Sequence, residues 1–95
     1  MNISELKVGM RKIDVNGKVD SMGDERLVNL KSGGTNRVAE AVISDGTGTI
    51  KLVLWGSDID KLRPGDKVAV SNGYTNSFKG EIQLATGKYG QLKRL

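Results

Sequence analysis

The sequence contains no cysteine and no histidine among its 95 residues. Without cysteine, neither a disulfide framework nor a thiolate zinc site can form, and without histidine the commonest remaining metal ligand is absent. We therefore expect a fold that depends on packing and strand pairing and that carries no metal or other cofactor. The lack of cysteine also fits a protein of the reducing cytoplasm.

Long apolar runs are missing as well. The longest covers residues 52–55, far short of the roughly 20 residues that a membrane-spanning helix needs. The first ten residues mix Asn2, Glu5 and Lys7 with apolar side chains, which is not the composition of a targeting segment. These features predict a cytoplasmic protein without a membrane partner.

Charge and length limit the possibilities further. Lys and Arg number 15 against 11 Asp and Glu, which gives a net charge of +4 and favours polyanionic partners. A chain of this length with 37% hydrophobic residues can build one core but not two. We expect a single domain over residues 1–95.

Five short runs have the character of β-strands, and clusters of Gly, Asp and Asn separate them, as is typical of a small all-β barrel. The runs cover residues 11–19, 37–44, 49–55, 67–72 and 81–85. Gly17 interrupts the first, where it marks either a bulge that helps a barrel to close or a position of no consequence. Residues 45–48, Asp-Gly-Thr-Gly, suit a tight hairpin between the second and third strands.

The segments between these strands are polar and rich in glycine. Residues 21–36 read as a long, mobile and partly basic loop, in which Leu27, Val28 and Leu30 are able to extend the flanking strands as a ribbon. A helical turn is expected over residues 57–62 and a loop over residues 73–80. Residues 86–95 are basic and receive no assignment.

The only tryptophan shares a strand face with a lysine. Strand alternation in residues 50–55 separates Ile50, Leu52 and Leu54 from Lys51, Val53 and Trp55. A core tryptophan would lie with the leucines, so the alternation favours the outer face of the barrel for Trp55. The alternative is that Trp55 plugs a barrel end beside Gly56.

Phe78 stands in a polar stretch, residues 74–80, and is therefore expected to be exposed. An exposed ring next to Lys79 is what base stacking requires, because the ring offers a flat apolar face and the ammonium meets a phosphate. The alternative is that Phe78 folds back over Leu84.

The side of the sheet on which Tyr74 lies stays open from the residues alone. Its parity matches that of Val68 and Val70, which are expected to be buried, unless Gly73 introduces a bulge.

The chain resembles the single-OB (oligonucleotide-binding) single-stranded DNA-binding proteins of archaea and the OB domains of archaeal replication protein A. The most specific similarity covers residues 38–56, VAEAVISDGTGTIKLVLWG, with weaker matches at residues 72–74 and 78–80. In those relatives three rings stack on bases, and by position Trp55, Tyr74 and Phe78 match them. Tyr74 stands where some members have tryptophan.

The resemblance implies a five-stranded Greek-key OB barrel that binds single-stranded DNA with little sequence preference, in DNA replication, repair or recombination. Bases are expected to stack on Trp55, Tyr74 and Phe78. Phosphates are expected to meet basic side chains, namely Lys51, Arg37 and Lys79, with Arg26, Lys31 and Lys88 as further candidates. Possible partners besides DNA are RNA, other OB domains and replication or repair proteins.

Two other functions remain open, an RNA- or tRNA-binding OB module and a protein-interaction OB domain of a replication complex. Enzymatic activity is not expected. The closest pair of carboxylates, Asp58 and Asp60, lies beside Ser57 and Lys61, where helix capping explains it, and no second acidic cluster suggests a two-metal site.

Overall fold

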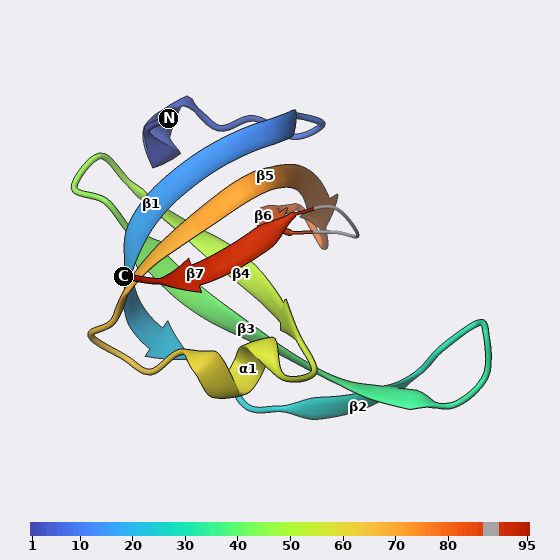
Figure 1. Cartoon of the computed structure of the whole chain (residues 1–95). Helices are drawn as coiled ribbons and strands as arrows, with labels where there is room; N and C mark the ends of the chain where they lie inside the picture. Colours follow the sequence, from blue (N-terminus) through green and yellow to red (C-terminus); the bar gives the residue numbers. More distant parts are fainter. Residues whose placement is uncertain (87–89) are drawn as a thin grey trace.

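The computed structural model describes residues 1–86 and 90–95, and almost all regular structure within them is β (Figure 1). The strands in these residues are β1 (Arg11–Met22), β2 (Arg26–Asn29), β3 (Thr35–Ser44), β4 (Thr49–Trp55), β5 (Lys67–Phe78), β6 (Glu81–Ala85) and β7 (Gln91–Arg94). A 3-10 turn, Ile3–Glu5, and one short helix, α1 (Asp58–Lys61), accompany them. No helix in the described ranges is long and apolar enough to span a membrane.

Five strands close into a ring, which confirms the predicted five-stranded barrel. β1 pairs with both β3 and β5, β4 pairs with β3 and β6, and β6 pairs with β5. All of these pairs are antiparallel except β4–β6. The long β1 makes closure possible, because residues 11–18 pair with β5 while residues 18–22 pair with β3.

The interior of the barrel is aliphatic. Ile50, Leu52 and Leu54 of β4 are buried there, as the alternation predicts, and α1 adds Ile59 to the same cluster. None of the aromatic side chains that the structure describes belongs to this core.

Gly17 lies at a close approach rather than at a bulge. The pairing of β1 shifts before it, between residues 11 and 15 against β5, and after it, between Val19 and Ser21 against β3. A Cβ atom at Gly17 would lie 3.1 Å from the carbonyl oxygen of Ser44, which is tighter than an ordinary contact. Glycine therefore lets β1 pass close to the end of β3.

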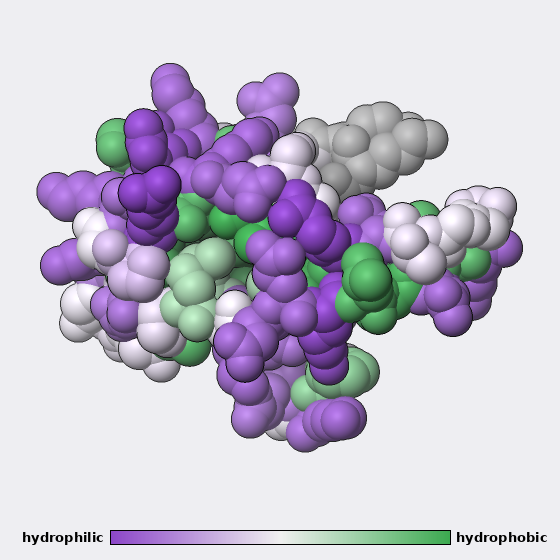
Figure 2. Space-filling view, turned by 90° about the horizontal axis from the view of Figure 1, so that it is seen from below, coloured by the Kyte–Doolittle hydropathy of each residue, from purple (hydrophilic) through white to green (hydrophobic). Residues whose placement is uncertain are grey.

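Part of the predicted loop over residues 21–36 is a ribbon. β2 pairs with the first half of β3, with Leu27 opposite Arg37, and this hairpin extends away from the barrel (Figure 1). Seen from below, the face that carries the ribbon is largely hydrophilic, with hydrophobic side chains where the ribbon leaves the barrel (Figure 2). Leu27 of β2 is 72% exposed.

In the C-terminal half one expectation is wrong and one segment without an assignment proves to be a strand. Residues 73–78 are not a loop, because β5 continues through them and pairs with β6 as far as Phe78 opposite Glu81. Residues 91–94, which received no assignment, form β7, which pairs with residues 68–71 on the edge of β5 opposite β1.

Candidate nucleic-acid interface

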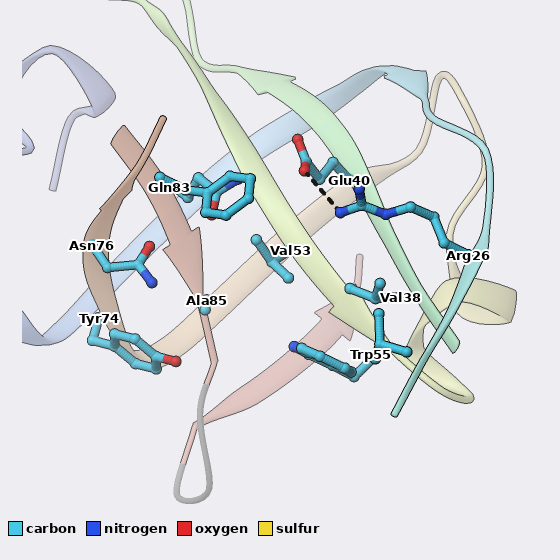
Figure 3. A pocket seen from close by; sticks show the side chains of 11 residues that line it. Arg26, Val38, Glu40, Val53, Trp55, Tyr74, Asn76, Gln83 and Ala85 are labelled. Atoms are coloured by element: carbon cyan, nitrogen blue, oxygen red, sulfur yellow. Dashed lines mark ion pairs between the residues drawn. The ribbon is translucent and has the colours of Figure 1, made fainter. Parts of the chain in front are cut away.

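The aromatic side chains of the described residues all line one open groove of about 320 Å³ (Figure 3). Trp55 ends β4, whereas Tyr74 and Phe78 lie on β5, and the three are 43%, 37% and 46% exposed. The remaining lining residues come from the outer faces of β2 to β6 and are Arg26, Val28, Val38, Glu40, Val53, Asn76, Gln83 and Ala85.

Trp55 lies on the outer face of the barrel, which confirms the interpretation of the β4 alternation. It pairs with Val38 of β3 across the sheet, and both side chains line the groove. The residue that follows β4, Gly56, has a φ of +55°, which few other residues adopt readily. The alternative, a tryptophan that plugs a barrel end, is wrong.

A bulge brings Tyr74 to the outer face. The register of β5 against β1 shifts after Val70, and Asn72 has a φ of +55°. One extra residue reverses the side chains that face inward, so Gly73 and Thr75 are buried while Tyr74 lies outside. The alternation that buries Val68 and Val70 therefore stops at Asn72. The bulge lies there, one residue before Gly73, which was the position considered from the sequence.

Phe78 is exposed, as predicted, although it ends a strand instead of standing in a loop. The two-residue turn that follows, Lys79-Gly80, has positive φ at both positions, the geometry of a type I′ hairpin. The Lys79 Nζ lies 5.4 Å from the centroid of the Phe78 ring. The alternative in which Phe78 folds back over Leu84 is wrong, because Leu84 belongs to the barrel core whereas Phe78 is exposed and lines the groove on the outer face.

Glu40, an acidic residue in the groove, forms ion pairs with two of the basic residues that were predicted to contact phosphates. Glu40 lies 3.8 Å from an Arg26 nitrogen and 3.7 Å from the Lys51 Nζ. Lys51 is also 2.5 Å from Glu81, and hydrogen bonding to Glu81 is the main reason that the pKa of Lys51 is raised. A second hollow of about 190 Å³ adjoins the groove at these side chains and at Lys79.

The structure does not bring Arg37 into the groove. Its guanidinium lies 2.8 Å from an oxygen of Asp60 and 3.4 Å from Glu25, and it donates to the carbonyl oxygen of Gly56 at 3.2 Å. Hydrogen bonding to Asp60 raises the pKa of Arg37 and lowers that of Asp60. Arg37 thus fastens β3 to α1, and we leave it out of the proposed contacts.

Of the last two residues predicted to contact phosphate, Lys31 lies away from the lining of the groove. Lys31 is exposed in the turn that joins β2 to β3. Lys88 falls outside the described residues. Asp58 and Asp60 lie in α1 and form ion pairs with Lys61 and Arg37, and no three acidic side chains of the described chain are grouped to hold a metal ion.

The sequence reasoning missed the polar residues between the rings. Asn76 was assigned to a loop, so its place on the outer face was not anticipated. For Gln83 a signal was present, because alternation in residues 81–85 places it with Glu81 on the side opposite Leu84. Glu40 could have been found in the same way from the alternation of buried Ala39 and Ala41.

The family model described as "Single-stranded DNA binding protein Ssb-like, OB fold" matches residues 4–94. The chain belongs to this family. Another Ssb-like protein, the single-stranded DNA binding protein Ssb of Saccharolobus solfataricus, is 33% identical over 85 residues. The match covers 90% of this chain and 57% of that protein, so the chain spans somewhat more than half the length of this relative.

Solved structures show the same fold for the Ssb-like chain. The replication factor A related protein from Methanobacterium thermoautotrophicum matches with a TM-score of 0.82 and 24% identity, over 100% of this chain and 89% of that one. The second OB-fold domain of replication protein A from Methanococcus maripaludis matches with a TM-score of 0.81 and 22% identity, over 100% and 93%. The predicted OB fold and the resemblance to archaeal OB domains are confirmed.

Proposed function

We propose that this chain binds single-stranded DNA with little sequence preference, by stacking bases on Trp55, Tyr74 and Phe78. The observation that carries the proposal is the position of these rings. Aromatic side chains are strong core builders, yet every ring in the described residues lies on one outer groove over an aliphatic core. An exposed ring stacks any base, with a free energy of about 1–3 kcal/mol each.

Phosphates are met by three basic side chains around the groove, Arg26, Lys51 and Lys79, which we call the groove cations. Lys79 has no ion pair with any described residue and stands beside Phe78. The other two are held by Glu40 and Glu81, and a bound phosphate takes the place of these carboxylates. Lys31 remains a predicted contact at the tip of the ribbon.

A binder of this kind covers on the order of 4 to 6 nucleotides, near the low end for OB folds. Tolerance of sequence suits DNA replication, repair and recombination, in which single strands of any sequence are exposed. The DNA-binding role that the name of the Saccharolobus solfataricus relative states supports this assignment. We place the protein on nucleoid DNA, together with other OB domains or with replication and repair proteins.

Fluorescence of the single tryptophan tests the proposal, because Trp55 lines the groove. Titration with oligo-dT should quench the emission. A matched duplex should quench it far less, since paired bases do not present their faces to the rings. Equal binding of duplex and single strand would reject stacking. Tighter binding of oligo-rU than of oligo-dT would favour the RNA-binding alternative.

A further inference from the structure

Gln83 is a buried polar side chain without a hydrogen-bond partner among the described residues. It lies in β6 and is only 6% exposed, yet its amide makes no hydrogen bond to any residue of the described chain. No fully buried side-chain nitrogen or oxygen in that part of the chain lacks a partner. The amide of Gln83 therefore keeps an opening to solvent, and the groove that it lines provides that opening. Since polar groups in such buried positions are nearly always hydrogen-bonded, the partner of this amide comes from the groove.

The place of Gln83 in the sheet points to a ligand. It pairs directly with Asn76 of β5, and Asn76 stands midway between Tyr74 and Phe78 on the outer face of the same strand. Figure 3 shows Asn76 turned into the groove, with Gln83 on the neighbouring strand. Two rings four residues apart on a strand are separated by roughly 13 Å. The amide pair therefore lies under the space that a base stacked against either ring would enter.

We propose that Gln83, assisted by Asn76, hydrogen-bonds the edge of one base in the groove. This inference rests on the proposed function and assigns a polar contact to the same site. In the proposed arrangement, the base stacks on Tyr74 or Phe78 and reaches with one edge the two amides that pair between these rings. The base then supplies a hydrogen-bond partner that no described residue provides to the Gln83 amide.

An amide accepts the natural bases without selecting one. It carries an acceptor oxygen and two N–H donors, and rotation of its terminal torsion exchanges their positions. It therefore meets the N3–H and O4 of thymine as well as the N4–H and N3 of cytosine. The subsite demands a hydrogen-bonding edge but not a particular base, which is compatible with the sequence tolerance of stacking.

A non-polar thymine isostere provides the test, because it stacks but cannot hydrogen-bond. Difluorotoluene replaces thymine at each position in turn of an oligo-dT short enough to prevent a shift of register. Trp55 quenching reports the affinity. At one position the isostere should weaken binding to the wild-type protein by about 5- to 150-fold, the cost of leaving a buried polar group unpaired. In Gln83→Met, which removes the polar atoms at similar length, this penalty should disappear.

Gln91→Met is the matched control, since it makes the same change on β7, at an exposed residue outside the lining of the groove. This variant should keep the penalty. Equal binding of all isostere oligonucleotides by the wild-type protein would overturn the inference while leaving stacking intact, and it needs no mutant to be folded. A penalty that survives in Gln83→Met would also overturn it. Absence of quenching by unmodified oligo-dT would overturn the proposed function and this contact with it.

Discussion

Replacement of Phe78 by alanine separates a ring that binds from a ring that holds the fold together. The ring lines the groove at 46% exposure and is absent from the core cluster, so its removal leaves no internal cavity. If one base stacks on it, Phe78→Ala should weaken single-strand binding by about 1–3 kcal/mol, roughly 5- to 150-fold. The loss should be similar for oligo-dT and oligo-dC, because every base presents a π-face.

The expected cost in stability is small. The contact with Lys79, 5.4 Å from the ring centroid, is exposed and is worth about 0.5–1 kcal/mol. That loss corresponds to a fall in Tm of no more than about 4–8 °C in a domain of this size. A buried phenylalanine would instead lose about 3–5 kcal/mol on truncation, and the fall in Tm would be far larger.

The assay combines thermal unfolding with Trp55 quenching on the same preparation. Phe78→Leu keeps an apolar side chain but removes the aromatic face, so it should lose affinity nearly as Phe78→Ala does. Leu27→Ala removes an exposed apolar side chain from the ribbon, outside the lining of the groove, and should bind normally. A strongly destabilised Phe78→Ala would refute the surface assignment, and a stable variant with normal affinity would refute the stacking role.

Three further outcomes follow from the charges. If the three groove cations contact phosphates, log affinity should fall with log salt at a slope of about −2, from about −0.7 per phosphate; a flat response in the titrations would contradict this. Glu40→Gln should strengthen binding at low salt, because it removes a carboxylate that competes with phosphate, and the gain measured by quenching should shrink as salt rises. The Asp45 carboxylate accepts from the Thr47 hydroxyl and from the Ile3 amide, and these bonds lower its pKa to about 2 from a usual 3.8. Since this folded-state pKa lies below the unfolded value, the stabilisation is present above about pH 4 and is lost towards pH 2. The Tm deficit of Asp45→Asn should therefore vanish over that interval in unfolding scans, and a constant deficit would disprove the assignment.

Strands whose burial pattern is contained in their own residues could be predicted from the sequence alone. The third and fifth predicted strands have the bounds of β4 and β6, residues 49–55 and 81–85. In β4 the alternation runs without a bulge between a tight turn and Gly56, so parity places Trp55 correctly. Such segments carry their burial pattern in their own residues.

Longer-range pairing decided the segments that were misread. Residues 73–78 contain glycine and asparagine, which locally favour a loop, yet β1 and β6 flank them and extend β5 to Phe78. The residues of β7 show no apolar alternation from which a strand could be predicted. β7 forms because the edge of β5 is available for pairing. Part of the pairing is distant in sequence, because β1 lies some 60 residues before residues 73–74 and β7 pairs with residues 68–71 of β5.

The bulge in β5 links this misreading to the binding face. Asn72 has a φ of +55°, a conformation that asparagine tolerates better than most residues, and Asp14 Oδ1 accepts from its backbone N–H at 2.9 Å. Without the extra residue, strand parity would turn Tyr74 and Phe78 inward, away from the face that carries Trp55. The groove therefore depends on one inserted residue, which exchanges the two faces of β5 halfway along its length. This exchange lets one strand supply valines to an aliphatic core and then rings to the surface.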